Sequence, residues 1–204
     1  MREDSSLEQH RLTSICAGPS RGPRRSDYAG AVIAVGGFET ARMRAEPIGP
    51  QHRDGLVALL GDERVGATLG GVAEPEAVDG QIARMAAHWA RAGFGWYAFL
   101  DRETGALVAR GGPHHCNVAG RDEVEIGWAV VPERWNEGLA TELGAASLAV
   151  AFGPLGLVDV VSFTLPDNRA SRRVMEKLGF AFERDTIHAG LPHVLYRLCA
   201  PLGS

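Results

Sequence analysis

The chain has 204 residues, of which 45% are apolar and 23% are charged, and its formal net charge is −4. This composition is typical of a globular protein with a buried core, and the length suits one domain with an appendage. The charge lacks the basic excess of nucleic-acid-binding proteins. No apolar run reaches the ~20 residues that span a bilayer, and no signal-peptide pattern opens the chain. We therefore expect a cytoplasmic protein without nucleic-acid or membrane partners.

The predicted elements follow a leader, residues 1–38, whose Ser, Arg, Gly and Pro content predicts disorder. The remaining residues, 39–204, show the patterns of a single domain. In chain order, the predicted strands cover residues 42–46, 94–100, 106–111, 124–131, 158–164, 180–184 and 193–198. The predicted helices lie around 56–60, after Pro75, and at 138–152 and 169–178. This order predicts a mixed α/β domain.

The cysteines and histidines do not predict a metal site. Cys16, Cys116 and Cys199 are odd in number and far apart, so we expect reduced thiols rather than a disulfide framework or zinc ligands. His114 and His115 precede Cys116 directly, and neighbours on a strand point to opposite faces, so these three cannot easily share one ion. One of the two histidines is instead a candidate to line an acceptor site.

The most informative segment runs from Pro132 to Glu142 and joins a predicted strand to a predicted helix. The first turn of a helix has unpaired N–H groups and partial positive charge, so it binds phosphate when side chains leave it open. Gly138 and the small Ala140 leave it open here. The Gly-Lys-Ser/Thr of a P-loop and the glycine triplet of a dinucleotide site are absent. From these residues alone, the alternative is that Gly138 has only a structural role at the start of the helix and binds no phosphate.

Three motifs resemble those of the GNAT superfamily of N-acetyltransferases. Residues 135–140, Trp-Asn-Glu-Gly-Leu-Ala, resemble its acetyl-CoA-binding motif, Gln/Arg-x-x-Gly-x-Gly/Ala. Residues 168–180 give a second match, with Asn-Arg-Ala-Ser at the start and Glu-Lys-Leu-Gly-Phe at the end. The weaker third match is Thr-Ala-Arg-Met-Arg at 40–44. Trp135 and the Ala-Thr-Glu after Leu139 resemble the Rim-type branch, named for enzymes that acetylate ribosomal-protein N-termini. The resemblance covers about residues 39–199.

The resemblance implies a GNAT-like mixed sheet, flanked by helices, in which the strands 124–131 and 158–164 splay apart. The pantetheine of acetyl-CoA would lie in this gap and pair with the backbone of Ala129 and Val130, whose N–H groups are also candidates to stabilise the oxyanion. Asn168 is a further implied cofactor contact, or a plain helix cap. The remaining implied cofactor-binding residues are Trp135, Asn136, Glu137, Gly138, Leu139, Ala140, Thr141 and Ser171.

Two positions depart from the family pattern. Asn136 replaces a usual glycine, which adds a side chain to the phosphate loop. Met175 stands where many members have a tyrosine general acid, and methionine cannot donate a proton. The resemblance to the Rim-type branch makes Ser171 the catalytic candidate beside the departing thiolate. The alternative is an ordinary small residue in the first turn of a helix.

Glu125 is the candidate general base, acting directly or through a water molecule. It lies on the strand that leads to the implied acetyl site, between Val124 and Ile126, and apolar surroundings raise a carboxyl pKa toward neutrality. The alternative is a solvent-facing carboxylate or the structural partner of an arginine. Glu123 shares its face of the strand and is the second candidate.

Together these features predict an acyltransferase that moves an acetyl group from acetyl-CoA to a primary amine by direct attack in a ternary complex. The amine belongs to a protein N-terminus or to a small molecule, and a homodimer is compatible with the sequence. One alternative is a non-catalytic module that binds or senses acetyl-CoA, which Met175 favours. The other is a nucleotide-dependent transferase, against which the missing P-loop lysine argues.

Overall fold

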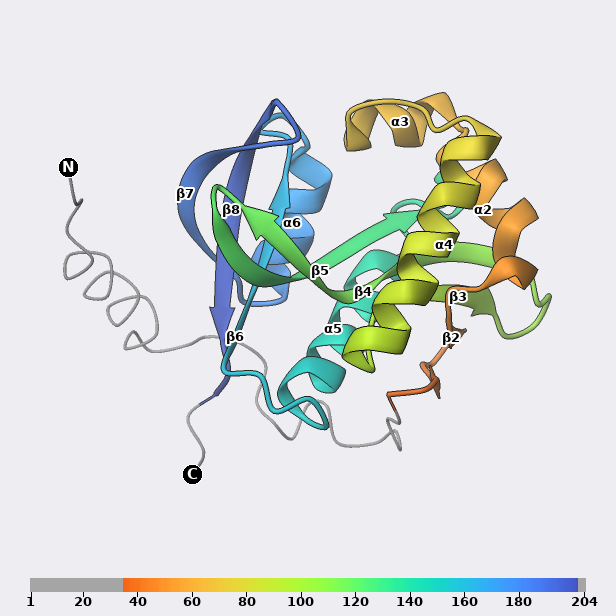
Figure 1. Cartoon of the computed structure of the whole chain (residues 1–204), viewed down its shortest axis with the longest axis horizontal. Coiled ribbons are helices and arrows are strands. Elements are labelled where there is room, and N and C mark those ends of the chain that lie inside the picture. The colour runs from red at the N-terminus through yellow and green to blue at the C-terminus, as the bar shows by residue number, and fades with distance from the viewer. Residues whose placement is uncertain (1–34, 202–204) are drawn as a thin grey trace.

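The computed structural model describes residues 35–201, which form one mixed sheet of eight strands (Figure 1). The strands are β1 (Phe38–Glu39), β2 (Met43–Pro47), β3 (Tyr97–Asp101), β4 (Leu107–Val118), β5 (Arg121–Val130), β6 (Asp159–Thr164), β7 (Ala181–His188) and β8 (Leu191–Cys199). Their order in the sheet is β1-β2-β3-β4-β5-β6-β8-β7. All neighbouring strands in this described region run antiparallel except β5 and β6. The predicted α/β fold class is confirmed.

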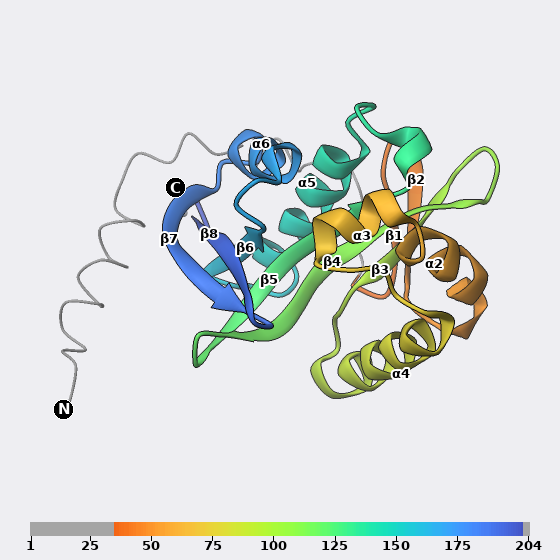
Figure 2. The ribbon, with the colours of Figure 1, turned by 90° about the horizontal axis from the view of Figure 1, so that it is seen from above.

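Helices cover both faces of this sheet. They are α2 (Arg53–Leu60), α3 (Glu63–Leu69), α4 (Pro75–Ala92), α5 (Leu139–Phe152) and α6 (Arg169–Lys177). Figure 2 shows α2 and α4 on one side of the central strands and α5 and α6 on the other. A single 3₁₀ turn at Pro50–His52 precedes α2, and another at Pro132–Arg134 follows β5. Between residues 35 and 201, no helix is long and apolar enough to cross a membrane.

The apolar stripe that predicts α4 faces the core. Val78, Ile82 and Met85 are buried between this helix, α2 and the sheet. Pro75 stands in the first turn, where its missing N–H costs nothing, and Gly93 ends the helix in the left-handed conformation at φ 74°. On the opposite face of the sheet, Leu143 of α5 is fully buried.

The strands β5 and β6 form the splayed pair that the family resemblance implies. They pair at one register position, Glu125 opposite Val161. β6 pairs with β8 along its whole length, and β4 pairs with β5 from the hairpin turn to Val130. The two central strands therefore separate after Glu125, and their ends diverge in Figure 1. The second half of β5, up to Val130, has no strand neighbour on that side.

A buried ion cluster joins the strands at the closed end of this gap. Arg197 of β8 donates to Glu123 of β5 at 2.7 and 3.1 Å, to Asp159 of β6 at 3.0 Å, and to Glu183 of β7. Burial lowers the pKa of Arg197, but the hydrogen bonds to Glu123 and Glu183 more than offset it and raise the pKa above the ordinary value. Glu123 and Asp159 precede the single β5–β6 contact, so the cluster fastens these strands where they still meet.

Several elements differ from the sequence predictions. Strand β1 was not predicted, and its Phe38, which the predicted disordered leader included, is buried in the core. The helix α3 was not predicted, because its seven residues carry no sustained apolar stripe and bury only Val65 and Gly66. The strand β4 continues to Val118 instead of ending at Gly111. A Cβ at Gly111 would lie 2.3 Å from the carbonyl oxygen of Gly127, so glycine here permits a close approach of two strands rather than a turn.

The expectation of three reduced thiols is wrong at Cys199, which is disulfide-bonded. Wide spacing in the sequence does not limit which cysteines meet in a fold. Cys116 is a free thiol, and burial raises its pKa to about 12, so it is not a reactive nucleophile. Cys16 and nearly all of the predicted leader 1–38 lie outside the described residues.

Candidate active site

The loop between β5 and α5 leaves the start of this helix open. Gly138 precedes the first turn with a φ of 84°, a conformation that favours glycine, and no side chain caps the helix. The first helical hydrogen bond runs from the N–H of Glu142 to the carbonyl of Gly138. The N–H groups of Leu139, Ala140 and Thr141 therefore have no intrahelical acceptor. Such donors, together with the helix dipole, suit an anion.

Asn136 also has a left-handed backbone, with a φ of 63°. Asparagine tolerates this conformation better than other residues with a side chain, which explains how it replaces the usual glycine of the motif. Trp135, beside it, donates its indole N–H to the carbonyl of Val130 at 2.8 Å. The loop is thereby folded back onto the end of β5.

Two arginines hold the same loop, and the sequence analysis assigned no role to either. Arg42 donates to the carbonyl of Glu137 at 2.9 Å and to the carboxylate of Glu142 at 2.7 Å. Arg134 donates to the carboxylate of Glu137 at 2.7 Å and to Asp101 at 2.9 Å. The sequence signal for Arg42 was its place in the weak motif at residues 40–44. Because both guanidinium groups pair with carboxylates, their role is to fix the conformation of the loop.

Glu142 joins the motif at residues 40–44 to the Ala-Thr-Glu segment that follows Leu139. Its carboxylate accepts from the hydroxyl of Thr40 at 2.6 Å and from the backbone N–H of Arg42 at 2.9 Å. Burial raises the pKa of Glu142, but these hydrogen bonds and the Arg42 side chain leave it below the ordinary value. A carboxylate in the first turn also favours the helix through its dipole. The Thr-Ala-Arg and Ala-Thr-Glu segments are therefore one physical unit.

The open side of β5 presents backbone groups in the gap. Val131 donates its N–H to Val108 of β4 at 2.9 Å. Because backbone groups alternate along a strand, Ala129 also turns its N–H toward β4, whereas Trp128 and Val130 turn theirs toward the gap. Of the two backbone positions expected to meet pantetheine, Val130 faces the gap and Ala129 pairs with Arg110 in the ladder.

The start of α6 lies across the gap from these groups. Asn168 accepts from the N–H of Ser171 at 3.0 Å, so it caps the helix. Ser171 is half-buried, and its hydroxyl makes no hydrogen bond within the described chain. Met175 is fully buried in the core beneath the helix. Ser171 is therefore available as a proton donor, and Met175 has a packing role.

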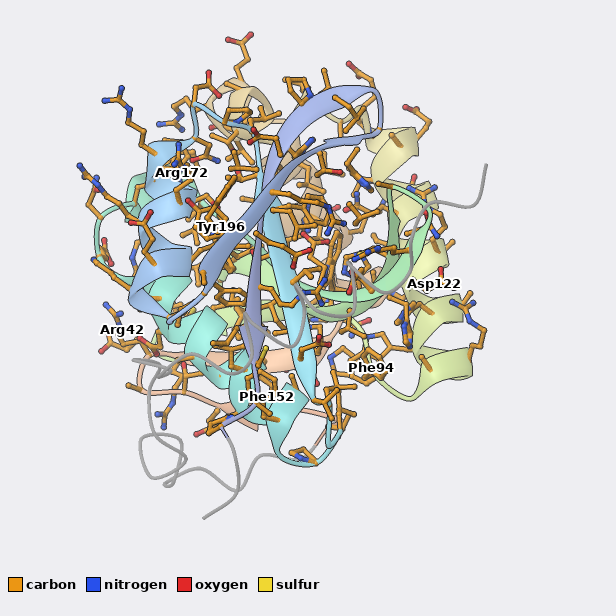
Figure 3. The ribbon with its side chains drawn as sticks, turned by 90° about the vertical axis from the view of Figure 1, so that its left-hand side faces the viewer. Arg42, Phe94, Asp122, Phe152, Arg172 and Tyr196 are labelled. Carbon is orange, nitrogen blue, oxygen red and sulfur yellow. The ribbon has the colours of Figure 1, made fainter. Side chains whose placement is uncertain are left out.

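The described tyrosines have other partners. Tyr97 is buried and donates its hydroxyl to the carbonyl of Val35 at 2.8 Å. Burial raises its pKa above the ordinary value. Tyr196 of β8 accepts from Nε of Arg172 at 3.2 Å, and Figure 3 shows the two side chains facing each other between β8 and α6. Tyr28 lies outside the described residues.

Glu125 has the environment of a base. Its side chain is only 12% exposed, and burial raises its pKa to about 7, while the charge of Arg110 lowers the pKa in part. Nδ1 of His114 lies 3.6 Å from Oε2, which is too long for a hydrogen bond. A Cβ at Gly127 would lie 3.0 Å from Oε1, so this glycine makes room for the carboxylate over the strand.

Glu123, the second candidate base, is an ion-pair partner instead. Both of its oxygens accept from Arg197. The alternative role of a structural partner for an arginine therefore describes Glu123 and not Glu125.

Three buried polar atoms without hydrogen-bond partners gather near Glu125. Within residues 35–201 they are Nε1 of Trp96, Nε of Arg110 and Nδ1 of His114. The guanidinium carbon of Arg110 lies 4.0 Å from the centre of the Trp96 ring, and the His114 ring lies 4.3 Å from it. The sequence assigns neither Trp96 nor Arg110 a functional role. These two residues stand out only in the folded structure, where their side chains pack on each other.

The neighbouring histidine cluster is structural. Nδ1 of His88 bonds the carbonyl of Phe94 at 2.8 Å, and Nε2 accepts from the N–H of His115 at 3.1 Å. Both ring nitrogens are therefore used, and burial lowers the pKa of this neutral side chain. Burial also lowers the pKa of His114 to about 3. No group of three or more His, Cys, Asp or Glu side chains in the described residues is arranged to hold a metal ion.

Residues 42–181 match the family described as "Acetyltransferase (GNAT) domain", which covers more than half of the chain. The chain belongs to the GNAT acetyltransferase family. It is therefore an acyltransferase, which confirms the predicted enzyme class. The match is to the family as a whole, so the Rim-type branch remains a prediction.

Two curated relatives of this GNAT protein carry acetyltransferase names. "Uncharacterized N-acetyltransferase YoaA" of Bacillus subtilis is 28% identical over 150 residues, which are 72% of this chain and 83% of the relative. "FsC-acetyl coenzyme A-N(2)-transacetylase" of Aspergillus fumigatus is 32% identical over 149 residues, 70% of this chain, and the match spans 63% of that protein.

A solved structure shares the GNAT fold. The acetyltransferase from Agrobacterium tumefaciens superposes with a TM-score of 0.70 at 22% identity, covering 83% of this chain and 97% of that one. At this identity the likeness concerns the fold, including the open eight-stranded sheet.

Proposed function

We propose that this GNAT enzyme transfers an acetyl group from acetyl-CoA to a primary amine by direct attack in a ternary complex. The observation that carries the proposal is the open β5–β6 gap, which connects the uncapped start of α5 with the buried carboxylate of Glu125. The residues fit the donor, because free N–H groups of α5 suit its phosphates and the open edge of β5 suits an amide-bearing chain. The name of the Aspergillus relative, an acetyl coenzyme A transacetylase, supports the choice of donor.

Each chemical step has a candidate group. Glu125 accepts the proton of the incoming amine, directly or through water, and a pKa of about 7 keeps it ionised above neutrality. As the N–C bond forms, the carbonyl oxygen gains charge, and the N–H of Val130 is the candidate donor to it. The C–S bond then breaks, and the hydroxyl of Ser171 is the candidate to give a proton to the leaving thiolate and to recover one from solvent.

The structure favours this reading over a module that only binds acetyl-CoA. A sensor has no use for a buried carboxylate without a hydrogen-bond partner, whose ionisation burial opposes. We also propose the Rim-type branch, because Glu142 of its Ala-Thr-Glu sequence bonds the Thr40 and Arg42 of the opening motif. The cytoplasmic location, the homodimer and the absence of nucleic-acid and membrane partners remain proposals from composition.

Gly138→Asp should abolish the stabilisation of the protein by acetyl-CoA. In the unchanged protein, a ligand at a hundredfold excess over its dissociation constant stabilises the fold by about 2.7 kcal/mol. An aspartate at Gly138 places negative charge and bulk at the N–H groups of α5. Thermal unfolding with and without acetyl-CoA measures the effect.

Gly105→Asp is the matched control for this experiment. Gly105 has a φ of 73° in the β3–β4 turn, and no atom lies within 4 Å of a Cβ placed there. The control variant bears the same backbone strain as Gly138→Asp but should keep the full response to acetyl-CoA. A normal response in Gly138→Asp would show that the phosphates bind elsewhere.

A further inference from the structure

Arg110 is a buried charge without a carboxylate partner. Its residue exposure is 5%, and it makes no hydrogen bond or ion pair within the described residues. Burial lowers its pKa to about 10, so the guanidinium still carries its charge at neutral pH. Arg197 is equally buried but meets three carboxylates. An unpaired buried cation is costly, so its presence indicates that a ligand supplies the missing anion.

The neighbours of Arg110 in the sheet are small. On the neighbouring strands, its register partners are the small residues Ala98 and Ala129. The guanidinium lies over the Trp96 ring, whose buried Nε1 is also without an acceptor. Two stacked side chains therefore each have a buried hydrogen-bond donor without an acceptor, Nε in Arg110 and Nε1 in Trp96. Both donors suit an oxyanion.

Glu125 lies close enough to act on this arginine through its charge, but not in contact with it. Each charge shifts the pKa of the other residue, yet no ion pair joins them. His114 packs on Trp96, as Arg110 does, and its Nδ1 lies 3.6 Å from the Glu125 carboxylate. An acceptor molecule whose amino group faces Glu125 and whose negatively charged group pairs with Arg110 would match both residues.

We propose that the acceptor is an amine of amino-acid type, whose carboxylate pairs with Arg110 while its amino group faces Glu125. This inference rests on the acetyl transfer proposed above. It also predicts selection against polyamines and aminoglycosides, because a second positive charge would meet the buried guanidinium. The net charge of −4, which on its own mildly favours a cationic acceptor, is a property of the whole surface and not of this site.

The test compares acids with their amides. The twenty L-amino acids and their carboxamides are offered with acetyl-CoA, and release of CoA and the mass of the acetylated product are followed. We expect kcat/KM for at least one amino acid to exceed that of its own amide about 10- to 100-fold, the range for a hydrogen bond to a charged group. Amines with a phosphonate in place of the carboxylate show whether the site accepts other oxyanions.

Arg110→Met should bring this ratio of acid to amide close to one, and Arg110→Lys should retain part of it, because lysine keeps the charge without the fork of donors. Arg53→Met is the control, since it removes an exposed arginine that pairs with Asp79, and its ratio should equal that of the unchanged protein. An unchanged ratio in Arg110→Met, or equal rates for acids and amides in the original protein, would overturn the inference.

A second readout does not depend on turnover. Replacing an unpaired buried cation by an apolar side chain should raise the thermal midpoint of the ligand-free protein by several degrees. A lower midpoint for Arg110→Met would show that Arg110 stabilises the fold itself, which contradicts the proposal. Rapid acetylation of amides and simple amines without preference for acids would retain the proposed function and reject this inference. Failure to release CoA with any of the compounds would reject both.

Discussion

Glu125→Gln is expected to lower the turnover number by ~10²–10⁴-fold and to stabilise the protein above pH 7. The first effect follows from loss of the base, because an amide of the same shape cannot accept the proton. The second follows from burial, which raises the pKa of Glu125 from 4.5 to about 7. This combination distinguishes a catalytic carboxylate from a structural one, whose removal would weaken the fold.

The direction of the pH dependence follows from the protons bound in each state. Between pH 4.5 and about 7, the folded protein keeps the proton of Glu125 and the unfolded chain loses it. Glu125 therefore contributes stability below pH 4.5 that is lost as the pH rises through about 7. Above pH 7 the burial of its charge costs up to roughly 3 kcal/mol. Glu125→Gln removes this cost, so urea unfolding should show a larger gain at pH 8 than at pH 5.

The rate–pH profile provides the second measurement. The unchanged enzyme should lose activity on acidification with a midpoint near pH 7, and this acidic limb should be absent in Glu125→Gln. In Arg110→Met the limb should move to higher pH, because the charge of Arg110 lowers the pKa of Glu125.

Glu123→Gln is the control, since it should retain the limb but destabilise the fold by weakening the bond to Arg197. An active Glu125→Gln with an unchanged profile would mean that the acceptor loses its proton to water before it binds, and catalysis would then rest on positioning and backbone donors.

The open start of α5 was predictable from sequence because the geometry of such a junction is local. Gly138, its neighbours and the strand–helix junction lie within a few residues, and helix geometry makes the N–H groups converge wherever such a junction forms. The burial of Glu125 was less predictable, because its neighbours Val124 and Ile126 point to the opposite face of the strand, where they pack with α5 and α6. Its pKa depends on the wider fold, because Gly127 makes room for the carboxylate and Arg110 lies nearby.

The cluster around Arg110 was not predictable in the same way. Trp96 precedes β3 and Arg110 lies within β4, and neither belongs to a motif. They meet because two antiparallel strands place distant residues side by side, and no periodicity in either strand specifies the register. The only local signal was a single arginine among the apolar residues of 106–111. The same argument applies to Arg197, whose three carboxylate partners come from three other strands.

Arg197→Met is expected to destabilise the protein by about 3–5 kcal/mol, a large part of the stability of a typical domain. The variant leaves Glu123, Asp159 and Glu183 together, and the side chains of Glu123 and Glu183 are 11% and 8% exposed. Their mutual repulsion raises their pKa values, so the loss should be smaller at acidic pH. Urea unfolding at pH 5 and pH 8 measures both effects.

Because this cluster joins β5 to β6 at the closed end of the gap, Arg197→Met should also weaken binding of acetyl-CoA by the folded fraction. The exposed pair of Arg53 and Asp79 provides the comparison, since Arg53→Met should change the free energy of unfolding by at most about 1 kcal/mol. A loss in Arg197→Met no larger than this control would show that water already screens the carboxylates. The separation of β5 and β6 would then be set by helix packing alone, with α5 against β5 and α6 against β6.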